Sequence, residues 1–108
     1  MIDAEKACMS VGGNLASIQN YGELSFIRRL IYRTLRSYRP AWIGLHDAVQ
    51  ERQFMWTDGS RVRYTCWDRG EPNNLYRREH CTEVYRSGIY WRDRPCYYYR
   101  PYICARDR

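Results

Sequence analysis

The stretch "AWIGL", residues 41–45, divides the chain into two parts of different character. Before it, apolar residues recur at helical spacing. After it, the apolar runs are short, rich in aromatic and β-branched residues, and separated by turn signals such as "TDGS" at 57–60. Two helices followed by a small antiparallel sheet with a long loop predict a single α+β domain over residues 1–108.

Two helices are predicted in the first part. Asp3 is placed to cap the first helix, which Gly12 and Gly13 end. Its apolar positions follow the helical repeat and are Ala4, Ala7, Cys8 and Val11. Asn20 and Glu23 form a capping box for the second helix, which cannot continue past Pro40. Its expected apolar face consists of Leu24, Ile27, Leu30 and Ile31.

The second part predicts short strands around a polar loop. The strand candidates after "AWIGL" are "QFMW" (53–56), "HCTEVY" (80–85), "GIYW" (88–91) and "PYICA" (101–105). Residues 62–78 are polar and show little periodicity, so we expect a loop there. The four tryptophans are expected in the core.

The five cysteines point to an oxidising compartment. None of them forms a CxxC pair, and a short chain with widely spaced cysteines is typical of a disulfide framework rather than a zinc site. We therefore expect a secreted protein whose signal segment has been removed, so that Met1 begins a fragment. No apolar run is long enough for a membrane span.

The net charge of +6 comes almost entirely from arginine, since Lys6 is the one lysine among eighteen basic residues. Arginine favours carboxylate, sulfate and phosphate groups and stacks on aromatic rings. The charge fits either a solvated basic surface or a polyanionic partner such as a sulfated or sialylated glycan. Nucleic acid fits the charge but not the oxidising compartment. The arginines nearest the loop in sequence are Arg61, Arg63, Arg69, Arg77, Arg78, Arg86 and Arg94.

Landmarks along almost the whole chain resemble the C-type lectin-like domain. In order they are "AEKAC", "GGNLASI", "WIGL", "WTDGS", "EPN", "EHCTEV", "YWRDRPC" and "YICA". The wording around "GGNLASI" and "HDAVQ" is most similar to fish lectins related to type II antifreeze proteins. The segment "LHDAVQERQFMW" also resembles mannose-binding lectins. The chain begins at the first helix, so the N-terminal strand of longer members is expected to be missing.

The resemblance implies two disulfides, Cys8–Cys104 and Cys81–Cys96. Cys66 is then left over, either as a partly buried thiol or as a cross-link to a second molecule.

The resemblance also implies a calcium and sugar site. Ca²⁺ takes six to eight oxygen ligands, so carboxylates and amides must converge on it. The family pattern falls on Glu71, Asn73, Glu79 and Asp93, with a cis peptide expected at Pro72. The Glu-Pro-Asn order is associated with mannose-type sugars.

Arg92 departs from the family pattern, which has asparagine at this position. Arginine supplies no oxygen and brings a positive charge. Two alternatives follow: Arg92 turns to solvent and leaves a weakened calcium site, or its guanidinium replaces the metal by pairing with Glu71, Glu79 or Asp93.

A second calcium of some family members would use Asp47, Glu51 and Glu79 with positions matching Asn74 and His80. The last two are an amide and an imidazole where acids are expected, so we expect that calcium site to be empty and Asp47 to form a turn. His46 and His80 lie in no HExxH pattern, and no GxSxG or phosphate loop is present, which argues against an enzyme.

The leading hypothesis is a secreted glycan-binding domain, with Ca²⁺ as its cofactor, that takes mannose-type or anionic sugars. The alternatives are an ice-binding protein of the type II antifreeze kind, and an assembly protein with an arginine- and tyrosine-rich surface, forming homo-oligomers through Cys66.

Overall fold

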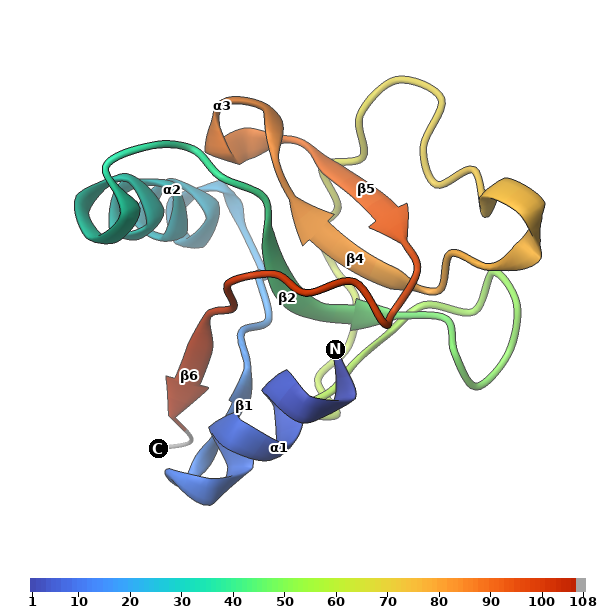
Figure 1. Ribbon diagram of the computed structural model, residues 1–108, viewed down its shortest axis with the longest axis horizontal. Coiled ribbons are helices and arrows are strands. Elements are labelled where there is room, and N and C mark those ends of the chain that lie inside the picture. Colours follow the sequence, from blue (N-terminus) through green and yellow to red (C-terminus); the bar gives the residue numbers. More distant parts are fainter. Residues whose placement is uncertain (107–108) are drawn as a thin grey trace.

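The computed structural model describes residues 1–106, apart from the side chain of Tyr76, and has the predicted α+β architecture (Figure 1). The helices are α1 (Ile2–Ser10), α2 (Tyr21–Leu35), the short α3 (Arg86–Ile89) and the 3-10 turn η1 (Leu75–Arg77). The strands are β1 (Gly13–Leu15), β2 (Ala41–His46), β3 (Met55–Trp56), β4 (Cys81–Val84), β5 (Trp91–Arg94) and β6 (Cys104–Arg106).

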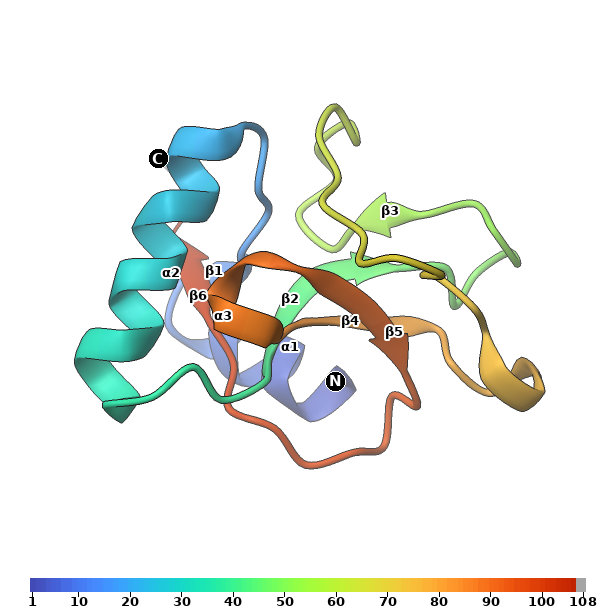
Figure 2. The same cartoon turned by 90° about the horizontal axis from the view of Figure 1, so that it is seen from above.

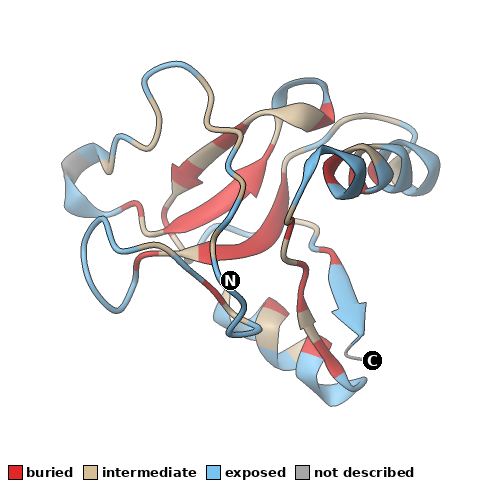
Figure 3. Cartoon of the chain, turned by 180° about the vertical axis from the view of Figure 1, so that it is seen from behind, coloured by how far each residue is buried: buried red, intermediate tan, exposed pale blue. Residues whose placement is uncertain are grey.

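Two antiparallel sheets organise the chain. The larger has the strand order β3-β2-β4-β5, and the smaller pairs β1 with β6, next to α1 (Figure 1). The "AWIGL" strand is central in the larger sheet, and residues 41–45 are all buried. Figure 3 shows burial concentrated in β2 and β4, whereas β6 is exposed. A strand buried on both faces reads as a continuous apolar run, which explains the absence of alternation in this segment.

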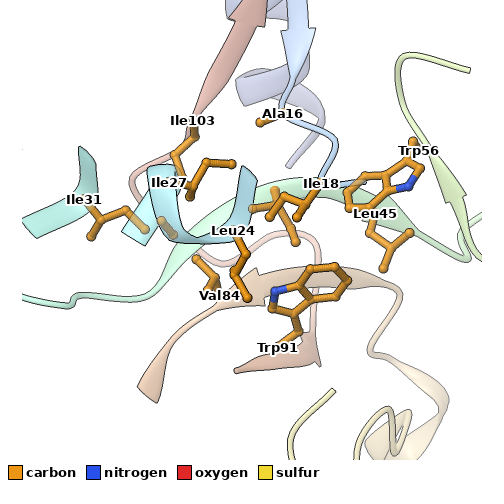
Figure 4. Close-up of a cluster of buried hydrophobic side chains, with 12 residues drawn as sticks. Ala16, Ile18, Leu24, Ile27, Ile31, Leu45, Trp56, Val84, Trp91 and Ile103 are labelled. Carbon is orange, nitrogen blue, oxygen red and sulfur yellow. The ribbon is translucent and has the colours of Figure 1, made fainter. Parts of the chain in front are cut away.

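The main core lies between α2 and the larger sheet (Figure 4). Leu24, Ile27 and Ile31 of α2 are buried in the same cluster as Val84 and Trp91 of the sheet, and Figure 4 shows Leu24 above these two residues. Leu30, expected on the same face, is instead 36% exposed. A second cluster beneath α1 consists of Ala4, Cys8, Leu15, Trp42 and Cys81.

The predicted cap of α2 is confirmed, whereas that of α1 is wrong. Asn20 Oδ1 accepts a hydrogen bond of 2.9 Å from the Glu23 amide. In α1, however, the N-cap residue is Met1, because the helix already begins at Ile2, so Asp3 lies within the first turn. Residues Ala4 and Cys8 are buried as expected, but Val11 is 57% exposed beyond the helix end.

The predicted strand at 88–91 is only partly correct. Residues Arg86–Ile89 form α3, and the strand begins at Trp91. Ser87 and Gly88 both have positive φ angles, which a strand cannot contain. A side chain at Gly88 would lie 2.8 Å from the Tyr38 ring, so this tight turn packs against the segment after α2.

Both disulfides implied by the resemblance are present. Cys8–Cys104 joins α1 to β6, and Cys81–Cys96 joins β4 to the segment after β5. Cys66 is a half-buried free thiol, and burial raises its pKa. Trp42, Trp56 and Trp91 are buried in the core, while Trp67 is half-buried against it.

Candidate functional site

The candidate site is formed by the loop from Glu71 to Glu79 and by Asp93 of β5. This loop extends from the larger sheet on the side away from α2 (Figures 1 and 2). The segment before it is attached to β5 by backbone hydrogen bonds, from Trp91 to Cys66 and from Asp68 to Trp91, both of 2.9 Å. The loop therefore starts beside β5.

Asp93 fixes the shape of the loop. Its carboxylate is fully buried, and its two oxygens accept backbone hydrogen bonds from Asn73, at 3.0 Å, and Asn74, at 2.7 Å. Asp93 thus holds Asn73 and Asn74 of the loop against β5.

Glu71 is the least satisfied group of the site. The Glu71–Pro72 peptide bond is cis, as expected. Oε2 of Glu71 accepts a hydrogen bond of 3.2 Å from the Asn73 amide, but Oε1 is buried and has no hydrogen-bond partner. Burial, and secondly the neighbouring Asp93, raise the pKa of Glu71 to about 7. A buried, unpaired carboxylate oxygen beside a second acid is an arrangement that a cation would stabilise.

Glu79 completes the set of oxygens. It is buried, and its Oε1 accepts a hydrogen bond of 3.1 Å from the Leu75 amide. Its other oxygen lies 3.2 Å from the guanidinium of Arg94. Asn73 is exposed, and its side-chain oxygen also accepts from the Leu75 amide, at 3.1 Å.

These residues are of the chemical kind that a hard cation takes. Three carboxylates and one amide converge from a loop and a strand, and the unpaired Oε1 of Glu71 is one open ligand atom. Within the described residues, however, Glu71, Glu79 and Asp93 do not bring one ligand atom each within 4.8 Å of one another. Five of their six carboxylate oxygens already have a partner: the Asn73 and Asn74 amides hold both oxygens of Asp93, the Leu75 amide and Arg94 hold those of Glu79, and the Asn73 side chain holds one of Glu71. Closing around an ion therefore requires these groups to shift or to share their contacts.

Both alternatives for Arg92 are wrong. Its Nε donates to Glu83 at 2.7 Å, and its guanidinium lies 3.8 Å from the centre of the Tyr85 ring. The side chain is only 21% exposed, and its ion pair is with Glu83 rather than with an acid of the site. The reason is strand geometry: Arg92 pairs across the sheet with Glu83, whereas Asp93, the next residue, points to the opposite face.

The burial of Glu83 and its pairing with arginines were not predicted from the sequence. Glu83 is fully buried, and its other oxygen accepts from Arg100 at 2.8 Å. The arginine that reaches the site is Arg94, because its pairing with Cys81 places it beside the start of β4, close to Glu79. An acid within an apolar β-like run, as in "CTEV", was the available signal for a buried ion pair.

The residues of the second family site also come together. Asp47 follows β2 and His80 precedes β4, and the Asp47 amide donates to the His80 carbonyl at 3.0 Å. His80 Nδ1 lies 3.1 Å from Asp47 and 3.9 Å from Glu51. Asn74 donates from its side chain to Glu51 and accepts from the Glu79 amide, which links this cluster to the loop. Asp47 forms a turn, as expected, by accepting from the Arg52 amide.

The arginines around the loop are mostly exposed. Arg86 pairs with Asp68 at 3.2 Å and lies 4.5 Å from the centre of the Tyr90 ring. Arg94 is the half-buried exception among the seven. No helix within residues 1–106 is long and apolar enough to cross a membrane.

Comparisons with known proteins place this geometry in a family. Residues 1–106 match the family model of the lectin C-type domain. The chain is 41% identical over 104 residues to the galactose-specific lectin nattectin of Thalassophryne nattereri, covering 96% of this chain but 65% of nattectin.

Solved structures agree with this match. The C-type lectin CEL-I of Cucumaria echinata superposes with a TM-score of 0.91 at 28% identity, covering 95% of this chain and 79% of CEL-I. The herring type II antifreeze protein superposes with a TM-score of 0.84 at 32% identity and the same coverage. The family match, the two disulfides and the loop held on Asp93 agree, and we conclude that this chain belongs to the C-type lectin family.

Proposed function

We propose that this chain is a carbohydrate-binding domain that holds one Ca²⁺ with Glu71, Asn73, Glu79 and Asp93 and binds its sugar at that ion. The observation that carries the proposal is the buried oxygen of Glu71 that has no hydrogen-bond partner beside the buried Asp93. Ca²⁺, when bound, supplies a centre that can coordinate two sugar hydroxyls directly.

The residues of the proposed site have different roles. Asp93 is buried and holds the loop in place through its two backbone hydrogen bonds. Glu71 and Asn73 lie at the outer edge, where a carboxylate accepts a hydrogen bond from a sugar hydroxyl and an amide donates one. Their Glu-Pro-Asn order supports a mannose-type sugar. Nattectin is named a galactose-specific lectin, so the two sugar classes need to be compared directly.

The proposal also includes the location of the protein and the absence of catalysis. Two disulfides and a lectin family support a secreted, extracellular protein that binds rather than catalyses. Exposed arginines around the loop suit anionic sugars such as sialylated or sulfated glycans as additional ligands.

Thermal unfolding with calcium and with a chelator tests the calcium site. A ligand present at 100 times its Kd that binds only the folded state raises the free energy of unfolding by about 2.7 kcal/mol. We expect such a stabilisation together with calcium-dependent retention on immobilised mannose, released by free mannose more readily than by free galactose. No stabilisation and no retention would contradict the proposal.

The likeness to herring antifreeze protein supports ice binding as a second candidate. The measurement is inhibition of ice recrystallisation at micromolar protein. Inhibition without retention on any immobilised sugar would favour ice binding over the lectin function. A dimer that disappears in Cys66→Ser would instead support assembly through the free thiol.

We predict that Arg94 weakens calcium binding. Its guanidinium is paired with Glu79 and must give up this contact, or share it, when a divalent cation enters. Removing one positive charge a few ångströms from the ion should tighten calcium binding by about tenfold. Arg94→Met removes the charge and keeps an unbranched apolar stem. The measurement is the calcium Kd by isothermal titration calorimetry.

Arg86→Met is the matched control, because it removes the same net charge at an exposed arginine whose partner is Asp68. Its calcium Kd should stay close to that of the unmodified chain. Equal tightening in the two variants would assign the effect to net charge and contradict the role of Arg94.

A further inference from the structure

A compact group of three potential metal ligands lies beside the proposed sugar site. Among the described residues, Asp47, Glu51 and His80 bring one ligand atom each to within 4.8 Å of one another. The group joins the end of β2 to the start of β4, where the Asp47 amide donates to the His80 carbonyl at 3.0 Å. Two neighbouring strands therefore hold Asp47 and His80 side by side.

The distances suit a small tetrahedral ion. Zinc bonds to nitrogen and oxygen are about 2.0–2.1 Å long, which separates two ligand atoms of a tetrahedron by roughly 3.3 Å. His80 Nδ1 lies 3.1 Å from Asp47 Oδ1 and 3.9 Å from Glu51 Oε1. Only a small movement of Glu51 is needed. Its side chain is 45% exposed, and its Oε1 must share or release the hydrogen bond from the Asn74 side chain to make this movement.

The ligands are already oriented by neighbouring groups. Asp47 has a side chain that is 1% exposed, and its Oδ2 accepts from the Arg52 amide at 2.9 Å, which leaves Oδ1 facing His80. Asn74 donates to Glu51. Such outer contacts fix ligand geometry in metal sites. An open cavity lined by Glu51, Arg52, Asn73, Asn74 and Arg77 borders the group on the side of Glu51.

We propose that Asp47, Glu51 and His80 form a binding site for a first-row divalent transition ion, with zinc as the natural probe. One imidazole and two carboxylates are a donor set that zinc accepts. The same set suits calcium poorly, because Ca²⁺ takes six to eight oxygens and the imidazole nitrogen stands where an oxygen would be needed. Histidine at position 80, where the family pattern has an acid, thus changes the class of ion that the site would bind.

Zinc titration by calorimetry, on protein without an affinity tag, tests this site. We expect one zinc ion per chain, with binding weakened at least about tenfold in His80→Gln and in Glu51→Gln. Glu51 has an exposed side chain, so its variant keeps the test valid if His80→Gln fails to fold. His80→Asp restores an acid and should lose zinc while gaining calcium at this position.

The controls separate this site from other zinc ligands and from the calcium site. His46→Gln removes the other histidine, and Cys66→Ser removes the free thiol; both variants should bind zinc like the unmodified chain. Glu71→Gln changes the proposed calcium site only. Zinc binding that is unchanged in this variant would show that zinc does not bind at the calcium site. Absence of zinc binding, or equal binding in His80→Gln and Glu51→Gln, would overturn the inference.

Discussion

Replacing both Cys8 and Cys104 by serine is expected to lower the free energy of unfolding by about 4–5 kcal/mol. The two residues are 96 positions apart in sequence, so the bridge restricts nearly the whole unfolded chain. In the chain-entropy model, the stabilisation grows with the length of the closed loop and reaches about 4.7 kcal/mol near 100 residues. Because a domain of this size is stable by only about 5–15 kcal/mol, the loss takes a large share of the total.

Packing adds to this expectation. Cys8 is fully buried in the cluster beneath α1, together with Leu15 and Trp42, so serine there also places a hydroxyl in an apolar environment. The smaller sheet contains only β1 and β6, and the bridge attaches α1 directly to β6. We therefore expect α1 and the smaller sheet to lose protection from hydrogen exchange before the larger sheet does.

The second disulfide provides the comparison. Cys81 and Cys96 are 15 positions apart, for which the same model gives about 3 kcal/mol. Denaturant unfolding of the two double-serine variants, each in a Cys66→Ser background to prevent exchange with the free thiol, measures both losses. An equal or greater loss on removing Cys81–Cys96 would show that loop length does not govern the stability of this domain.

Local signals predicted the elements whose shape depends on nearby residues. The Asn20 cap and the apolar face of α2 follow from the sequence within one helix, and "AWIGL" has the composition of a buried strand. The α3 turn was missed because its backbone angles at Ser87 and Gly88 depend on packing against Tyr38, which is distant in sequence. The disulfide pairing followed from the family resemblance and not from cysteine spacing.

The site shows the same limit more sharply. The resemblance proposes four ligand positions because it fixes their order along the chain, but it did not identify the arginine that contacts Glu79. Arg92 and Arg94 differ by two positions, and only the register of β5 against β4 pairs the first with Glu83 and sets the second beside Glu79. Register depends on tertiary pairing, which a single sequence does not specify. The proximity of His80 to Asp47, by contrast, was implied by the resemblance, which assigns both positions to one family site.

Glu71→Gln is expected to weaken calcium binding while stabilising the calcium-free domain near neutral pH. The variant removes a carboxylate from the proposed calcium site, which should weaken calcium binding by at least about tenfold, because affinity depends on the number of charged ligands. Without calcium, however, the ionised Glu71 is unfavourable: its Oε1 is buried and unpaired, and Asp93 is its neighbour. A neutral amide of similar shape avoids placing that charge there.

The raised pKa of Glu71 determines how the stability of the calcium-free domain changes with pH. The pKa of Glu71 is raised from its ordinary value of 4.5 to about 7 by burial and secondly by Asp93. Such an acid keeps its proton longer in the folded state, so its contribution to stability is complete below pH 4.5 and is lost as the pH rises through about 7. Calcium-free wild-type protein should therefore lose stability, relative to Glu71→Gln, between pH 4.5 and 7. The difference between the two proteins isolates Glu71, because His46, whose pKa is lowered by burial, titrates in both.

Calcium is expected to reverse which of the two proteins has the higher melting temperature. Above pH 7, saturating calcium binds the ionised Glu71 and should raise the melting temperature of the wild type above that of Glu71→Gln, whereas with a chelator the variant melts higher. A residue retained only for structure would not give this crossing, because its replacement would destabilise the domain with or without the ion. This reversal of the two melting temperatures is expected when a carboxylate destabilises the calcium-free domain and stabilises the calcium-bound one. Other functional sites likewise lower the stability of the free protein. If Glu71→Gln melts lower than the wild type in the presence of chelator at pH 7.5, Glu71 is a structural residue and the calcium site must lie elsewhere.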